Sequence, residues 1–189
     1  MTKLVGFAGS LRRASYNRAL LRAAAELMPS GATLEIVPID DIPLYNGDVE
    51  ASGIPPAVTA LKEAIATADG LVIATPEYNN SIPGVAKNVI DWASRPPSDV
   101  KRVLHGKPVA LLGASPGRFG TILSQSAWGP VLRTLRMKLW TGAGPFYLAS
   151  AASEFDENGS MTNAETRERL REYLAAFVAE LKSRPTNSA

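Results

Sequence analysis

Cysteine is absent from all 189 residues of the sequence. This absence excludes thiol nucleophiles and disulfide bonds. It also excludes iron–sulfur clusters and zinc sites that are held by cysteine. Redox chemistry, if the protein performs any, therefore depends on a bound cofactor.

Histidine is almost as scarce, since His105 is the only one. It lies three residues before the start of a predicted strand, at the end of the strand opposite the one where ligands bind in parallel sheets. We interpret it as a surface residue and not as a catalytic base. This disfavours a Ser–His hydrolase, and we expect no metal site.

Long apolar runs and strong charge are also missing. No stretch is apolar for long enough to span a bilayer, and the first apolar run is too short for a signal peptide. The net charge is only +2, and the basic residues are dispersed, which gives little support to nucleic-acid binding. We expect a cytoplasmic protein with no membrane or nucleic-acid partner.

The composition is that of a folded protein, with 46% hydrophobic and 20% charged residues. The length suits one domain with a single substantial core. We predict one domain over residues 1–184 and a frayed tail over residues 185–189.

Short β-type runs alternate with helical patterns along the chain. The runs cover residues 3–8, 32–38, 70–75 and 108–115, with a weak fifth run within residues 138–148. This alternation predicts an α/β fold whose parallel sheet has helices on both faces.

Three other segments carry more specific expectations. Residues 40–54 read as a long loop, and a helix near residues 120–136 is expected to kink or split at Gly129-Pro130. Thr162 and Glu165 form a capping-box pattern before the closing helix.

Ligands of open parallel sheets bind beyond the carboxyl ends of the strands, where the strand order reverses. The first loop at that edge, residues 9–17, gathers hydroxyls, an amide and arginines at a helix start, which suits a phosphate dianion. In the alternative, Ser15 only caps the helix and the arginines are solvated. The P-loop and G-x-G-x-x-G motifs are absent, which disfavours an ATPase or a Rossmann dehydrogenase.

The second loop, residues 75–84, has prolines near both ends and holds Tyr78, Asn79 and Asn80 between them. A restricted backbone of this kind can present N–H groups to a flat heterocycle, although an ordinary Asn-rich turn would look the same. We interpret Glu77 as a structural carboxylate bonded to backbone and not as a general base. The third loop, residues 113–120, is rich in glycine and contains Arg118, so it fits either close ligand approach or a plain turn.

Together these motifs resemble the NADPH-dependent FMN reductase family, which includes quinone, azo-dye and chromate reductases. The first loop contributes Gly9-Ser10-Leu11-Arg12 with Ser15 and Asn17. The second contributes Pro76-Glu77-Tyr78-Asn79-x-Ser81-x-Pro83-Gly84-x-x-Lys87-Asn88-x-Ile90-Asp91-Trp92, and the third Ser115-Pro116-Gly117. The resemblance covers nearly the whole chain.

The resemblance implies a flavodoxin-like three-layer sandwich with a five-stranded parallel sheet in the order 2-1-3-4-5. It also implies a bound FMN. The phosphate would be held by the first loop, through Ser10, Leu11, Arg12, Ser15 and Asn17. The isoalloxazine would be lined by Pro76, Glu77, Tyr78 and Asn79, and approached by Ser115 and Gly117. The segment after Gln125 is longer than in the pattern of chromate-reducing members, which leaves acceptor specificity and subunit pairing open.

The expected activity is that of an NAD(P)H-dependent FMN or quinone reductase. NADPH or NADH would pass a hydride through FMN to a quinone, free flavin, azo dye or metal oxyanion, in a ping-pong cycle. The candidates for contacting the phosphates of the nicotinamide cofactor are Arg12, Arg13, Arg95 and Arg118. The alternatives are a flavodoxin-type electron carrier and a flavin-binding redox sensor.

We also expect a homodimer or homotetramer, because Trp92 and Trp128 lie on helices that flank the flavin loops and would otherwise expose aromatic surface. The physiological acceptor, the preference between NADPH and NADH, and the choice between dimer and tetramer stay open.

Overall fold

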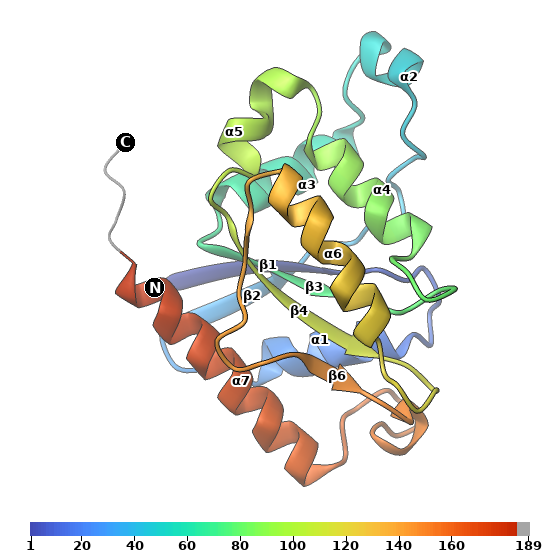
Figure 1. Ribbon diagram of the computed structural model, residues 1–189, viewed down its shortest axis with the longest axis vertical. Coiled ribbons are helices and arrows are strands. Elements are labelled where there is room, and N and C mark those ends of the chain that lie inside the picture. Colours follow the sequence, from blue (N-terminus) through green and yellow to red (C-terminus); the bar gives the residue numbers. More distant parts are fainter. Residues whose placement is uncertain (185–189) are drawn as a thin grey trace.

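A computed structural model describes residues 1–184, so the predicted tail at residues 185–189 lies outside the described part. Four parallel strands form the centre of the sheet in the order β2-β1-β3-β4 (Figure 1). Their bounds are β1 Thr2–Ala8, β2 Ala32–Ile36, β3 Gly70–Ala74 and β4 Pro108–Ala114. The predicted flavodoxin-like strand order is confirmed.

The fifth position of the sheet is shared by two short strands, β5 (Lys138–Leu139) and β6 (Phe146–Leu148). β5 pairs with the first residues of β4, and β6 pairs with its last residues. Between them the chain leaves the sheet at Trp140, whose indole packs on Tyr173 and Phe177. The fifth strand is thus divided into two short pieces, which explains why the sequence shows only a weak strand there.

Helices cover both faces of the sheet, as Figure 1 shows. On one face lie α1 (Tyr16–Glu26) and α7 (Ala164–Ser183), which share a buried cluster with Leu4 of β1. On the other lie α3 (Pro56–Thr67), α4 (Gly84–Ala93) and α6 (Ile122–Thr134), packed on Val5 and its neighbours. Successive strand residues thus enter opposite cores, as a sheet covered on both sides requires.

Two further short helices complete the fold. The long loop expected at residues 40–54 contains α2 (Gly47–Ser52), which Asn46 caps with its side chain. α5 (Val100–Val103) follows the 3-10 turn Pro97–Asp99.

α6 is continuous through Gly129-Pro130, so the expectation that the helix splits there is wrong, and the expected kink stays a prediction. Proline removes the hydrogen bond to the carbonyl four residues earlier, here that of Ser126. Ser126 and Pro130 are both exposed, so water can take the place of the missing donor. The buried side chains of Trp128 and Leu132 hold the helix on the sheet.

The capping box predicted at Thr162 is also wrong. α7 begins one residue later, and Asn163 caps it by accepting hydrogen bonds from Glu165 N and Thr166 N at 3.1 and 3.2 Å. The Thr162 backbone N–H instead donates to Glu154 O. Asparagine is at least as good an N-cap as threonine. The local sequence therefore could not decide whether Thr162 or Asn163 caps the helix.

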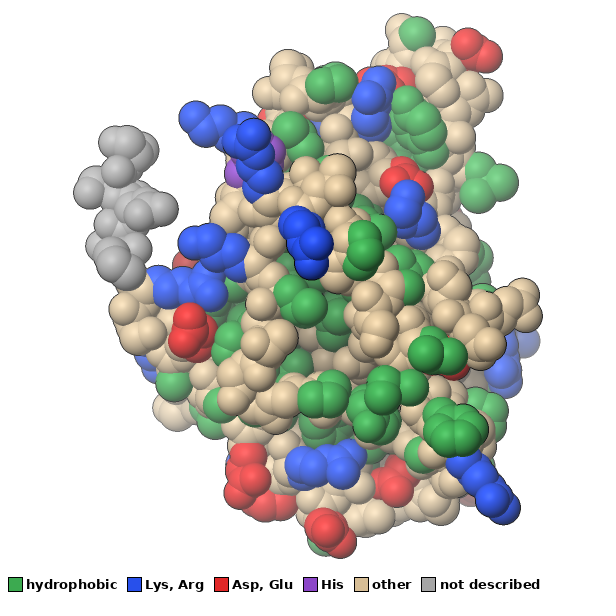
Figure 2. Space-filling view, in the orientation of Figure 1, with side chains coloured by type: hydrophobic (Ala, Val, Ile, Leu, Met, Phe, Trp, Pro, Cys, Tyr) green, Lys and Arg blue, Asp and Glu red, His purple; other side chains and the backbone are tan. Residues whose placement is uncertain are grey.

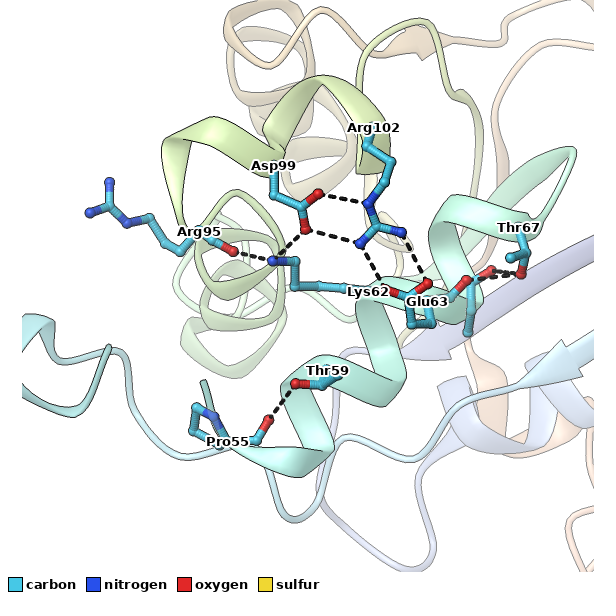
Figure 3. A network of polar contacts seen from close by, with 9 residues as sticks. Pro55, Thr59, Lys62, Glu63, Thr67, Arg95, Asp99 and Arg102 are labelled. Carbon is cyan, nitrogen blue, oxygen red and sulfur yellow. Dashed lines mark hydrogen bonds and ion pairs between the residues drawn. The ribbon is translucent and has the colours of Figure 1, made fainter. Parts of the chain in front are cut away.

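A polar network joins α3 to the segment after α4 (Figure 3). The buried Lys62 ammonium lies 2.8 Å from Asp99 Oδ2 and also donates to Arg95 O. Arg102 donates to Asp99 and Glu63. Hydrogen bonds from Arg102 and Lys62 hold the pKa of Asp99 well below its usual value. The network is a structural clamp between these elements, because Lys62 has both a carbonyl and a carboxylate partner.

Trp92 and Trp128 are completely buried within a single chain. Trp92 Nε1 donates to Pro43 O at 2.8 Å, and both indoles belong to tightly packed surroundings. The expectation that they would leave aromatic surface exposed is therefore wrong.

Candidate functional site

The first, second and third loops leave β1, β3 and β4 at the same edge of the sheet, because the three strands are adjacent and parallel. This edge is where Figure 1 shows the connections into α1, α4 and α6. The strand order reverses at β1 and β3, which is the usual ligand position of such sheets.

The first loop presents a run of unused backbone donors. The N–H groups of residues 11–16 donate to no acceptor within residues 1–184. They surround the N-terminus of α1, where Ser15 caps the helix by accepting from Asn17 N and Arg18 N. Free N–H groups and the positive end of a helix dipole together suit a phosphate. Ser15 therefore caps the helix, as the alternative from the sequence proposed. The same segment still offers unused N–H groups to an anion.

Arg18 and Tyr78 both contact Ser10 and hold the first loop in place. Arg18 Nε donates to Ser10 O at 2.9 Å, and its guanidinium also pairs with Asp40. Ser10 is buried, and its hydroxyl lies 3.5 Å from Tyr78 Oη of the second loop. The first two loops therefore meet at Ser10 and Tyr78.

Asn17 ties the first loop to the third. Its side chain is only 3% exposed, donates to Ala114 O at 2.8 Å and accepts from Ala114 N at 2.9 Å. Both ends of the amide are thus used within the protein. Asn17 therefore links the first and third loops. The phosphate contact that the resemblance implies for Asn17 stays a prediction.

We predict that Asn17→Asp lowers the free energy of unfolding by about 3 kcal/mol, because an aspartate cannot donate to Ala114 O and leaves a buried carbonyl facing a carboxylate. Urea denaturation of the wild type and the variant measures the change. The matched control is Asn158→Asp, which changes an exposed asparagine whose side chain makes no hydrogen bond within residues 1–184. Equal stability of Asn17→Asp and wild type would contradict this linking role of Asn17.

The second loop is a tight turn closed by reciprocal hydrogen bonds between Tyr78 and Ser81. Asn79 and Asn80 have φ angles of 50° and 60°, as in the type I′ turns that asparagine favours. The Asn-rich turn considered from the sequence is therefore present. It leaves the N–H groups of Asn79 and Asn80 unused and exposes the Tyr78 ring.

Glu77 has the structural role that the sequence suggested. Its Oε2 accepts from Leu123 N at 2.8 Å and Ser124 N at 3.0 Å, so it caps the first turn of α6. Beneath it, Thr75 Oγ1 lies 2.9 Å from Ser124 Oγ, a buried hydroxyl pair that sequence reasoning missed. A carboxylate is favourable at a helix N-terminus, and here it joins the second loop to α6.

The third loop is anchored to the segment after β6. Ser115 N donates to Leu148 O, Ala151 N donates to Ser115 O, and Ser150 N donates to Gly117 O. Ser115 Oγ lies 3.5 Å from Gly117 O. The N–H groups of residues 117–120 have no acceptor within the described chain, so this loop also has donors to offer.

The four candidate arginines do not converge. Arg95 Nε pairs with Glu50 Oε2 at 2.8 Å, which raises the pKa of Arg95, and its guanidinium lies over the Tyr45 ring. Arg12 and Arg13 line one cavity at the first loop, and Arg118 lies in the third loop. The cofactor role suggested for Arg95 is disfavoured because its charge is already paired.

The described residues fit an FMN in their donor chemistry, with free N–H groups for a phosphate and a polar turn with an exposed tyrosine for a flat ring. They bring no three metal-ligating side chains together. Over residues 1–184, every helix is too short or too polar to cross a membrane.

Comparison with known proteins agrees with this geometry. The family model of NADPH-dependent FMN reductases matches residues 2–152. An NAD(P)H-dependent FMN reductase from Pseudomonas aeruginosa is 45% identical over 93% of this chain and 92% of its own. A 2-hydroxy-1,4-benzoquinone reductase from a Burkholderia species is 40% identical over 96% and 97%.

A solved structure gives the same result. The flavoenzyme NAD(P)H:(acceptor) oxidoreductase from Paracoccus denitrificans superposes with a TM-score of 0.84 at 32% identity, covering 96% of this chain and 98% of its own. The resemblance inferred from the three loops is confirmed over most of the length. The chain belongs to the NADPH-dependent FMN reductase family.

Proposed function

We propose that the protein binds one FMN per chain and uses it to reduce a quinone at the expense of NADPH or NADH. The observation that carries this proposal is the run of unused N–H groups over residues 11–16, at the N-terminus of α1 and beside the exposed Tyr78. Quinone is the chosen acceptor because the Burkholderia relative is a benzoquinone reductase.

The phosphate of FMN would bind at the first loop. Backbone N–H groups of residues 11–16, the hydroxyls of Ser10 and Ser15, and the Arg12 guanidinium are the available donors there. Leu11 contributes its N–H and a half-exposed side chain. Charge-assisted hydrogen bonds of this kind are stronger than neutral ones, so the first loop would supply much of the affinity.

The isoalloxazine would lie between the second and third loops, lined by Pro76, Glu77, Tyr78 and Asn79 and approached by Ser115 and Gly117. Bound FMN supplies hydride acceptance at N5 and returns two electrons to the acceptor. The free N–H groups of Asn79 and Asn80 would stabilise negative charge on the reduced ring. Glu77 keeps the second loop in position and exchanges no proton.

The nicotinamide cofactor and the quinone would use the same open face in turn, which is a ping-pong cycle. Hydride leaves the nicotinamide, and the quinone later takes up two electrons and two protons to become a hydroquinone. Within the second loop, Glu77 and Tyr78 are the only titratable side chains. We therefore expect water to supply the protons that the quinone takes up. A cytoplasmic location belongs to this proposal, because NADPH is available there.

The test is to purify the protein, record its visible spectrum and follow oxidation of NADPH and NADH with benzoquinone. Flavin absorbance at one FMN per chain, turnover with benzoquinone, and parallel lines in double-reciprocal plots are expected. An electron carrier or a redox sensor would bind flavin and leave NADPH unoxidised. A protein that takes up no FMN in a fluorescence titration would contradict the whole proposal.

The proposal includes a homodimer or homotetramer. Large apolar side chains are exposed beside the third loop, with Phe119 79%, Ile122 41% and Leu123 46% accessible. Figure 2 shows hydrophobic side chains on the face that carries α6. An exposed apolar group of this size next to a ligand site is typical of a surface that a partner covers.

We therefore predict that light scattering at micromolar concentration gives a mass of at least two chains. Leu123→Glu is expected to shift the population toward single chains, because it places a charge in the contact. The control Leu44→Glu changes a side chain that is also exposed but lies in the segment before α2. A wild-type mass of one chain would contradict the prediction.

A further inference from the structure

A cavity of about 370 Å³ lies between α6 and the segment that joins β5 to β6. None of its lining residues belongs to the first, second or third loop, and none carries a charge. Its apolar wall includes Leu111 of β4, Ile122 of α6, and Leu139, Trp140 and Pro145. We call it the α6 cavity.

The break in the fifth strand leaves the space for this cavity. β4 pairs with β5 up to Val109 and with β6 from Leu112 onward, and Leu111 between these two pairings lines the cavity. The segment that joins β5 to β6 runs beside α6 (Figure 1). The Trp140 indole packs on aromatic rings of α7, so it forms one wall and leaves the space next to α6 unfilled.

Two glycines shape the joining segment. A Cβ at Gly142 would lie 2.8 Å from Trp140 Nε1, so glycine lets the indole lie close to the backbone. Gly144 has a φ of 75°, and its N–H donates to Thr141 O at 3.0 Å. The segment thus closes into a compact turn between Trp140 and the start of β6, which maintains the cavity.

The α6 side chains that contribute polar groups to the wall already have partners. Gln125 Nε2 donates to Phe146 O at 2.9 Å and to Thr121 Oγ1 at 3.2 Å. Ser126 Oγ donates to Ile122 O at 2.8 Å. An uncharged, mostly apolar wall around a volume of this size is typical of a site for the apolar part of a ligand.

The α6 cavity adjoins the place proposed for the isoalloxazine. Ile122 is the first residue of α6, and the next residue, Leu123, donates its N–H to Glu77 of the second loop. Leu111 is four residues before Ser115 of the third loop, which corresponds to roughly 13 Å along a strand. A ligand whose ring lies at the flavin therefore has an apolar space within reach of an attached chain.

We propose that the α6 cavity binds the alkyl or isoprenoid chain of a quinone substrate, so that the protein prefers quinones with a chain to chainless ones. The inference rests on the proposed function, which places a quinone ring at the flavin. The chain would pass Ile122 and lie against Leu139 and Trp140. Transfer of the chain from water to this wall favours binding in proportion to the apolar area that is buried.

The test compares two quinones that differ only in the chain, 2,3-dimethoxy-5-methyl-1,4-benzoquinone and its 6-decyl derivative, with NADPH and the FMN-loaded protein. The decyl quinone is expected to have a KM at least about tenfold lower, because only its chain reaches the cavity. The same turnover measurements on the chainless quinone report the flavin site alone.

Two variants alter the cavity at exposed positions. Leu139→Lys places a charge in the wall, and Ser126→Phe fills the space from α6. Each should raise KM for the decyl quinone about tenfold and leave kcat and KM for the chainless quinone within about twofold. Leu44→Lys is the control, because it makes the same change at an exposed leucine before α2. Urea denaturation is expected to show that all three variants are folded.

Binding of 1-decanol gives a readout that needs no turnover. Isothermal calorimetry should show that it binds the FMN-loaded wild type and binds Leu139→Lys at least about tenfold more weakly. Equal KM values of the wild type for the two quinones, or equal rises of both in the variants, would overturn the inference. So would Leu139→Lys lowering the mass in light scattering with the chain preference unchanged, because a second chain would then occupy the cavity. Failure of the proposed function would appear instead as no NADPH or NADH oxidation by the wild type, and decanol binding would still test the cavity.

Discussion

Gly113→Ala is expected to destabilise the protein by about 3 kcal/mol or more, the upper end of what overpacking a core costs. A Cβ at this position would lie 1.7 Å from Thr121 Oγ1 and 2.9 Å from Thr75 O. Thr121 is fully buried and its hydroxyl accepts from Gln125 Nε2, so it has no free space to move into. Thr75 O belongs to the backbone of the second loop and cannot rotate away.

The same substitution should abolish FMN binding, because a Cβ at Gly113 of β4 would collide with Thr75 of the second loop and with Thr121 at the start of α6. Urea denaturation and a fluorescence titration with FMN measure the two effects. Gly129→Ala is the matched control. A Cβ at position 129 in α6 would meet nothing within 4 Å, and alanine there should stabilise the helix by about 0.5–1 kcal/mol. A Gly113→Ala variant as stable as Gly129→Ala would contradict the packing argument.

Arg12→Ala is expected to raise the FMN dissociation constant about ten- to a hundredfold. Hydrogen bonds to charged groups contribute about 1.5–3 kcal/mol, and Arg12 is the side-chain cation of the first loop that the family resemblance places at the phosphate. This rise in the dissociation constant should become smaller at higher salt concentration, because Arg12 is exposed. Fluorescence titrations with FMN and with riboflavin measure it.

Riboflavin lacks the phosphate, so its affinity should be the same for the wild type and Arg12→Ala. Arg171→Ala controls for the loss of one positive charge on the surface. Arg12 also lines the cavity between α1 and the turn at residues 155–159, so a second outcome is informative. Unchanged FMN affinity with a higher KM for NADPH would assign Arg12 to the nicotinamide cofactor and remove it from the FMN phosphate site.

The wrong predictions share a cause, which is that local patterns report propensity and not packing. Pro130 lowers helix propensity, but the burial of Trp128 and Leu132 keeps α6 continuous. Thr162 and Asn163 are both good caps, and the hydrogen bond from Thr162 N to Glu154 O decided between them. Trp92 and Trp128 fitted either the core or an interface, because burial within one chain and burial between chains give the same sequence pattern, and the structure places both in the core.

The sequence by itself determined the α/β class, the strand order through the family resemblance, and the three loops that carry the chemistry. These follow from signals within a few residues of one another, such as alternating apolar runs, proline and glycine at turns, and hydroxyls before a helix. The lack of cysteine also depends on no structure. These features can be predicted without information about contacts between distant parts of the chain.

Only the tertiary structure decided which side chains join the loops and which remain available to a ligand. Asn17 pairs with Ala114 across 97 positions, and Glu77 with Leu123 across 46. Arg22 Nη2 lies close to Gly159, which is far along the chain. An isolated asparagine, glutamate or arginine looks the same in sequence whether it binds a ligand or its own backbone, because the partner is chosen by packing between distant segments.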